Sequence, residues 1–264
     1  MPANRLNRIQ LGGFHGNEWA WPEGNTSTGE TRPLCWLHPS VDRSPAEPIW
    51  IPDEAWGSMG GSMLLLSYGT GKVMSVMTQE VDGVIQAAVT ETAVQLPTGA
   101  MRGRFNPTDG HLYVCGLVGW SSDQTDAGGF YRVRRTGEPV RHPVAFHAAN
   151  DGIVIRIAQR LDAKAAEDPS NWTRESWDYR GSARYGSAEY RRDGAEGRDT
   201  HVVESVTVSR DQRSVFLSIP DIHPVMQFHV QMTAAFQDGG AQLNYLHGTL
   251  HDLADKPAAS ALEE

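Results

Sequence analysis

Cysteine is scarce in this sequence of 264 residues, which contains only Cys35 and Cys115. Neither belongs to a C-x-x-C-H haem motif or to a zinc-type cysteine pair, so covalent haem attachment and a cysteine-based zinc site are excluded. The two cysteines lie far apart in the chain. Either they form one disulfide or, as we expect, they are two free, buried thiols.

Basic residues are also in short supply. The chain has 23 Lys and Arg against 32 Asp and Glu, a formal net charge of −9, and an isoelectric point near 5.6. A nucleic-acid surface needs clustered excess Lys and Arg. The local cluster of Arg132, Arg134, Arg135 and Arg141 is too short to supply one, so we expect no nucleic-acid partner.

Long apolar runs are absent as well. None is long enough to cross a bilayer as a helix, and the mean hydropathy is −0.43. The first residues, MPANRLNRIQLGG, lack the apolar centre of a signal peptide. We therefore expect no membrane insertion, and a chain that is either cytoplasmic or the mature or excised piece of an exported protein.

Short strand-like segments separated by turn residues are what the sequence does contain, and this pattern is typical of all-β barrels, sandwiches and propellers. Only residues 161–167 (LDAKAAE) favour a helix. The expected strands are 48–51, 63–68, 72–78, 85–94, 103–105, 111–117, 129–135, 152–157, 172–180, 201–209, 215–219, 227–233 and 243–251. The predicted fold class is therefore all-β.

A Pro-flanked linker, residues 138–143, follows Thr136-Gly137 and predicts a domain boundary. We expect a propeller-like β region over 1–137, a β-sandwich-like domain over 138–253 and a disordered tail over 254–264. A propeller blade takes four strands in roughly 40 to 50 residues. The first region would thus supply two blades, too few to close a ring of four to eight.

Arg102 and Arg104 stand out in the segment 97–120 because alternate residues of a strand share one face. Their two guanidiniums could together hold one anionic, planar ligand, since Arg donates in a rigid fork suited to carboxylates. The alternative is that both pair with acidic neighbours across the sheet.

The motifs around these arginines carry a family resemblance. They read R-x-R-F at 102–105, D-G-x-L-Y-V at 109–114, G-x-x-G-W at 116–120 and G-F-Y-R-V-R-R-T-G at 129–137. The pattern resembles the closing blades of glucose/sorbosone dehydrogenase-like propellers. It is most similar to the C-terminal part of the large quinoprotein-like "membrane-bound dehydrogenase" proteins of planctomycetes, and the similarity extends over nearly all of the chain.

This resemblance implies a quinoprotein-like sugar or alcohol dehydrogenase that uses pyrroloquinoline quinone and calcium, in an exported or periplasmic setting. Arg102 and Arg104 match the R-x-R that contacts the cofactor in that family. The family's catalytic histidine has no counterpart in this chain. The resemblance therefore implies ligand binding with incomplete catalysis.

Histidine supplies two further candidates among the ten present. His247 and His251 are four residues apart, on one face of either a helix or a strand, so they could bind a metal together. His147 precedes Asp151 in a segment that also occurs in the resembling proteins, and it could be a general base oriented by that carboxylate. In both cases the alternative is a histidine with a structural role.

Two other functions stay open. One is a calcium-assisted lactone or ester hydrolase, because hard cations need only converging oxygens; its carboxylates would be Asp53, Glu54, Asp109 or Asp123. The other is a non-catalytic carbohydrate-binding or interaction module. Its stacking groove would be lined by Trp50, Trp56, Trp120 and Phe130.

Overall fold

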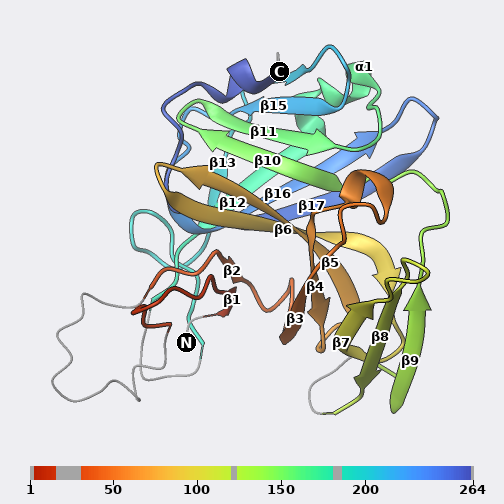
Figure 1. Ribbon diagram of the computed structural model, residues 1–264. Helices are drawn as coiled ribbons and strands as arrows, with labels where there is room; N and C mark the ends of the chain where they lie inside the picture. The colour runs from red at the N-terminus through yellow and green to blue at the C-terminus, as the bar shows by residue number, and fades with distance from the viewer. Residues whose placement is uncertain (1–2, 16–30, 120–123, 181–185, 263–264) are drawn as a thin grey trace, which may run out of the picture.

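The computed structural model describes residues 3–15, 31–119, 124–180 and 186–262, and within these ranges the chain is nearly all-β (Figure 1). The predicted fold class is confirmed. Four antiparallel sheets form among the described residues, and none of them closes into a barrel. No helix in these ranges has the length and apolarity needed to span a bilayer.

An eight-stranded sheet is the centre of the fold (Figure 1). Its strands, in spatial order, are β13 (Asp199–His201), β12 (Trp172–Trp177), β16 (Val225–Ala235), β17 (Ala241–Leu250), β6 (Val84–Gln95), β5 (Lys72–Val81), β4 (Met63–Ser67) and β3 (Pro45–Trp50). Strands from before and after the predicted boundary at Thr136-Gly137 thus share one sheet, with β17 beside β6.

A four-stranded sheet covers one face of this large sheet, which we call the inner face. Its strands are β10 (Pro143–Ala149), β11 (Gly152–Ile157), β15 (Ser214–Ser218) and β14 (Ser205–Val208). Side chains alternate between faces along a strand, so Phe228 and Val230 of β16 meet Ile155 and Leu217 in one apolar core. Full burial of such a side chain contributes about 1.5–3 kcal/mol.

Two smaller sheets complete the fold. A three-stranded sheet of β7 (Gly99–Phe105), β8 (Leu112–Leu117) and β9 (Gly128–Val133) packs on the other end of the inner face, where Leu64 and Leu66 meet Leu112 and Val114. A pair of short strands, β1 (Asn4–Leu6) and β2 (Cys35–Leu37), lies on the opposite, outer face against Val76 and Val89. The remaining outer face, beyond this pair, carries the polar side chains described below.

The structure differs from the expectations at several points. Strand β10 was not predicted, because its Pro143 read as part of the linker. The helix α1 is shorter than expected, Ala163–Ala166, with Asp162 accepting a hydrogen bond from the Ala165 N–H. Residues 254–262, expected to be disordered, instead include the 3-10 helix η4 (Ala258–Leu262), which packs on β11 and β15 with Ala258 fully buried.

Both cysteines are free thiols, but only one is buried. Cys35 lies in the core at the start of β2, and burial raises the pKa of its thiol to about 12. Cys115 is exposed on β8, so the expectation of a buried thiol is wrong at that position. The outward direction follows from the alternation on β8, where Val114 takes the inward place.

Candidate functional site

The outer face of β12, β16 and β17 carries polar and aromatic side chains in two cross-strand rows. Thr173, Gln231 and Tyr245 are paired in one row, and Glu175, His229 and His247 in the next. The alternating residues on the inner face are mostly apolar, as expected for a sheet with one buried face. We call these two rows the polar face.

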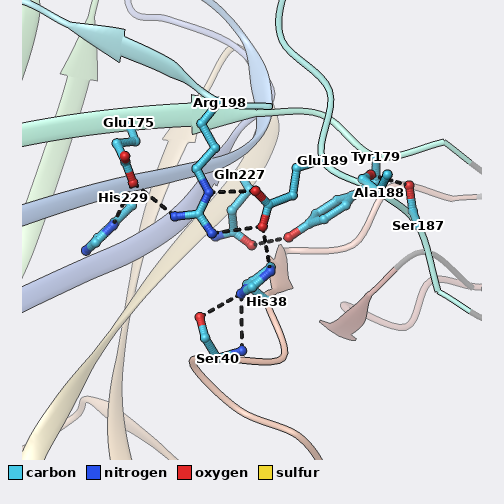
Figure 2. Close-up of polar contacts among 10 residues, drawn as sticks. All are labelled: His38, Ser40, Glu175, Tyr179, Ser187, Ala188, Glu189, Arg198, Gln227 and His229. Atoms are coloured by element: carbon cyan, nitrogen blue, oxygen red, sulfur yellow. Dashed lines mark hydrogen bonds and ion pairs between the residues drawn. The ribbon is translucent and has the colours of Figure 1, made fainter. Parts of the chain in front are cut away.

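Arg198 is the charged centre beside the polar face (Figure 2). Its Nε and Nη2 donate to the two carboxylate oxygens of Glu189, at 2.7 and 2.8 Å, and its Nη1 donates to Oε2 of Glu175 at 3.0 Å. The guanidinium lies 4.0 Å from the ring centroid of Trp177, which adds a cation–π contact. Two carboxylates are therefore fixed in place by one forked donor.

The loop that supplies Glu189 and Arg198 folds back on itself before it reaches the sheet. Tyr190 forms isolated bridges with Asp178 and with Glu196, and the Arg180 guanidinium lies 3.8 Å from the Tyr190 ring centroid. These contacts bring Glu189 next to Arg198 although neither lies in a long strand. The sequence analysis singled out neither residue.

His38, which directly follows β2, also belongs to this network (Figure 2). Its Nε2 lies 2.8 Å from Oε1 of Glu189, and its Nδ1 accepts from the backbone N–H of Ser40 at 3.1 Å and lies 2.6 Å from Ser40 Oγ. Since Nδ1 accepts, the ring proton is on Nε2 and is donated to Glu189. Desolvation lowers the pKa of His38, although Glu189 opposes this shift.

A stack of rings lies next to Glu175 on the polar face. The imidazoles of His229 and His247 are stacked with centroids 4.5 Å apart and an interplanar angle of 15°. Tyr245 lies 5.5 Å from His229 and 6.1 Å from His247. Burial lowers the pKa of both histidines, and that of His247 falls well below 6.5, so both rings are neutral at pH 7.

Two nitrogens of this stack have no hydrogen-bond partner among the described residues. They are Nε2 of His229 and Nδ1 of His247, and each is shielded from solvent. The Nδ1 of His229 is 3.6 Å from Oε2 of Glu175. Buried polar atoms without partners are uncommon in folded proteins, so these two nitrogens are candidate contacts for a ligand or for ordered water.

A cleft of about 550 Å³ opens beside Ser40, the partner of His38. Its lining is almost entirely polar and includes Arg43, Lys72 and Gln95. The Nζ of Lys72 is 2.5 Å from Oε1 of Glu91. Ser40 therefore both lines this cleft and contacts His38 of the charged network.

Arg102 and Arg104 lie on β7, away from the polar face. The Nη1 of Arg104 donates to both oxygens of Glu47 at 2.9 Å, with 75% of the arginine side chain exposed. Arg102 is exposed, and its Nη1 donates to the carbonyl of Met101 at 2.7 Å. This arrangement does not fit a clamp of two free guanidiniums for a quinone cofactor, and the cofactor-binding role of the pair stays a prediction.

His147 and Asp151 hydrogen-bond to different groups. The Nδ1 of His147 is 3.1 Å from Nε2 of Gln79. The carboxylate of Asp151 accepts from the backbone N–H groups of Ala258 and Ala259, at 2.7 and 3.4 Å, and so caps η4. Asp151 thus has a clear structural role, and the general-base role of His147 stays a prediction.

His247 and His251 also have separate partners. His247 stacks on His229, whereas Nε2 of His251 donates to the carbonyl of Pro33 at 2.6 Å. Across the part of the chain that the structure describes, no group of three or more His, Cys, Asp or Glu side chains is placed to hold a metal ion. The expected metal pair therefore has no third protein ligand within that part.

The aromatic residues expected to form one groove are spread over different elements. Trp50 and Phe130 are exposed on β3 and β9, and Trp56 packs edge-on against Phe105 at 5.1 Å. Trp120 and Asp123 lie outside the described residues. Of the expected calcium carboxylates, Asp109 accepts hydrogen bonds from the His111 N–H and the Tyr113 hydroxyl, as a turn former does.

A second polar cluster, which the sequence analysis did not predict, lies at the inner-face corner of β12 and β13. The Oγ of Ser176 is 2.6 Å from Nε2 of His201, whose Nδ1 is 2.6 Å from Oδ2 of Asp221. This connectivity matches that of a Ser-His-Asp triad. However, Ser176 is fully buried and 56% of the Asp221 side chain is exposed, the reverse of what an attacking serine requires.

Comparisons with known proteins add no assignment to this geometry. No model of a known protein family matches the chain, and searches of curated proteins and of solved structures return no similar chain.

Proposed function

We propose that this chain is a non-catalytic binding module that takes a carbohydrate on its polar face. The observation that carries the proposal is the ring stack of Tyr245, His247 and His229 beside the fixed carboxylate of Glu175. A sugar presents C–H groups on one side of its ring and hydroxyls at its edge. The C–H groups pack on aromatic rings, and the hydroxyls bond to carboxylates and neutral imidazoles.

The protonation states support a neutral polyhydroxyl ligand over a charged one. Lowered pKa values keep His229 and His247 neutral at pH 7, so each imidazole has one donor and one acceptor nitrogen. Arg198 is already neutralised by Glu189 and Glu175. The polar face thus offers mixed donors and acceptors beside one guanidinium shared by two carboxylates, a set that matches hydroxyl groups better than it matches an anion.

Catalysis has less support than binding. The carboxylates of the network are held by Arg198, which lowers the pKa of Glu189 and keeps it ionised. A glycosidase needs one of its two carboxyl groups to be a proton donor with a raised pKa. The oxidoreductase and the calcium-assisted hydrolase stay predictions that rest on the family resemblance and on turn carboxylates.

The test is titration of the chain with a panel of soluble neutral oligosaccharides, followed by nuclear magnetic resonance of the histidine rings. We expect saturable binding that shifts the His229 and His247 signals, and Tyr245→Ala should weaken it at least tenfold, about 1.4 kcal/mol. The matched control is Phe130→Ala, an exposed aromatic on a different sheet, which should leave affinity unchanged.

Two results would overturn the proposal. One is that no oligosaccharide binds, or that binding survives Tyr245→Ala unchanged. The other is turnover: dye reduction after addition of pyrroloquinoline quinone and calcium would support the dehydrogenase, and chelator-sensitive ester cleavage would support the hydrolase.

A further inference from the structure

A second cavity lies on the inner side of the molecule, between the three-stranded sheet and the end of β6. Its volume is about 190 Å³, and residues of the segment 133–142 form one wall. Figure 1 shows this segment leading from β9 to β10. Apolar groups of Trp56, Met59, Val94, Val133 and Val140 form much of the surface. Pockets for drug-sized ligands measure about 300 Å³ or more, so this cavity suits a smaller occupant, about one ring in size.

Three guanidiniums surround this cavity, against a single carboxylate, that of Glu138. The side chains of Arg134 and Arg135 are exposed and make no hydrogen bond or ion pair with any part of the chain that the structure describes. Arg141 pairs through Nη2 with Asp238 at 2.6 Å, but its Nε is buried without an acceptor. Free cations beside an apolar wall are notable in a chain of net charge −9.

Trp56 adds another donor without an acceptor. Its Nε1 is buried and has no partner among the described residues, although its ring is fixed against Phe105. The backbone of Trp56 is left-handed (φ 56°, ψ 22°), a conformation that non-glycine residues rarely adopt and that clusters at ligand sites. The next residue, Gly57, lets Arg135 approach, because a Cβ there would lie 2.4 Å from the Arg135 Nη1.

The lining therefore combines two buried N–H donors that lack acceptors, Trp56 Nε1 and Arg141 Nε, and the exposed guanidiniums of Arg134 and Arg135 with an apolar interior. A carboxylate supplies two acceptor oxygens in the plane that a guanidinium fork recognises, and an attached ring fills the apolar volume. We propose that this cavity binds a small carboxylate with a flat, apolar body, held by Arg134, Arg135 and the Trp56 N–H. The site is distinct from the polar face and does not depend on the carbohydrate proposal.

Benzoate is the probe, titrated into the full chain by calorimetry, with benzamide as its neutral isostere. We expect saturable benzoate binding and none of comparable affinity for benzamide. Arg135→Gln should weaken benzoate binding at least tenfold. Trp56→Phe, which keeps the ring and removes the N–H, should weaken it by a few-fold.

Arg132→Gln is the matched control. Arg132 is exposed on β9, two residues before Arg134, and does not line the cavity, so this variant should bind benzoate like the wild type. Thermal unfolding of each variant checks that the fold is retained. The proposal is overturned if benzoate does not saturate, if benzamide binds equally, if Arg132→Gln has the same effect as Arg135→Gln, or if inorganic phosphate binds as tightly as benzoate.

Discussion

Two arginines near opposite faces of β12 are held in contrasting ways. Arg198, beside the outer face, keeps 30% of its side chain exposed and makes three hydrogen bonds to two glutamates. Arg174, on the inner face, is fully buried, and none of its three side-chain nitrogens has a partner among the described residues. The longer-range charges of Asp221 and Asp199 favour its ionised form.

The pKa directions of the two groups express this difference. Glu189 raises the pKa of Arg198, so the folded state favours its charge. Burial lowers the pKa of Arg174 to about 10, so the folded state opposes its charge. A buried ion without direct partners costs several kcal/mol of desolvation. The comparison teaches that β12 stabilises charge on its outer face and tolerates it on its inner face.

The largest effect is expected from Arg198→Met. Removal of the guanidinium leaves Glu175 and Glu189 without their shared partner, and we expect the free energy of unfolding to fall by about 2 kcal/mol, between the values for exposed and buried pairs. Urea denaturation measures this. Arg191→Met, which removes the longer 3.5 Å pair with Asp193 in the same loop, is the control and should change stability by less than about 0.5 kcal/mol. Equal losses of unfolding free energy in the two variants would mean that Arg198 stabilises the fold no more than an ordinary surface arginine does.

The pH dependence of stability comes next. Burial lowers the folded pKa of His247 below the unfolded value of 6.5, so the unfolded state takes up protons first. The stabilisation is therefore complete above pH 6.5 and is lost as the pH falls towards the folded pKa. His247→Gln should flatten this loss in denaturation curves measured from pH 7.5 to 5.

Asp42 contributes to the pH dependence of stability in the opposite direction to His247. Burial raises its folded pKa to about 6, from 3.8, so its effect favours the folded state at low pH and is lost as the pH rises through 6. Because Asp42 is common to both proteins, the difference between wild type and His247→Gln isolates the histidine. An unchanged slope in the variant would mean that His247 does not titrate differently in the two states.

A smaller effect, of opposite sign, is expected from Arg174→Met. Methionine fills much of the same volume without a charge, and replacement of buried ions by apolar residues is often neutral or stabilising. We expect the free energy of unfolding to rise by about 1 kcal/mol. A loss of similar size to that of Arg198→Met would show that Asp221 and Asp199 compensate the buried charge fully, and the contrast between the two arginines would then fail.

The smallest effect is expected at Ser176, beside Arg174. Its hydrogen bond to His201 has the geometry of an activated serine, but the hydroxyl is fully buried. We expect no labelling by a fluorophosphonate in the native protein, as measured by intact mass. Stoichiometric labelling that disappears in Ser176→Ala would make this serine a nucleophile and overturn the assignment of a structural role.

The positions of the strands could be predicted from the sequence more accurately than the pairing of the strands in sheets. Alternation and turn residues located most strands within a few positions, because both are local properties of the chain. The pairing of β6 with β17 is not local, so the large sheet that joins the two predicted halves could not be read from the sequence. Strand β10 was missed because Pro143 begins it.

Apart from His247, the residues of the candidate site were missed for a related reason. The alternation in TRESWDY could have placed Glu175 and Trp177 on one face, but their partners arrive from distant segments. His38 precedes Glu189 by a long stretch, and Arg198 lies in a loop without periodicity. Arg102 and Arg104 were singled out because their spacing is visible in the sequence, whereas the Glu47 that binds Arg104 is 57 residues away.

The pairing of β17 with β6 has a consequence for how the chain folds. The register joins His247 to Val89 and Gly248 to Ala88, and a Cβ at position 248 would lie 2.7 Å from the Ala87 carbonyl oxygen, so glycine lets the two strands approach. During synthesis β6 emerges long before β17, on the order of ten seconds at typical elongation rates. During that time the backbone N–H and C=O groups along this edge of β6 are unpaired, so another strand can pair with them wrongly. Non-local pairing of this kind also slows folding, so refolding should be slow and prone to aggregation until the last long hairpin docks.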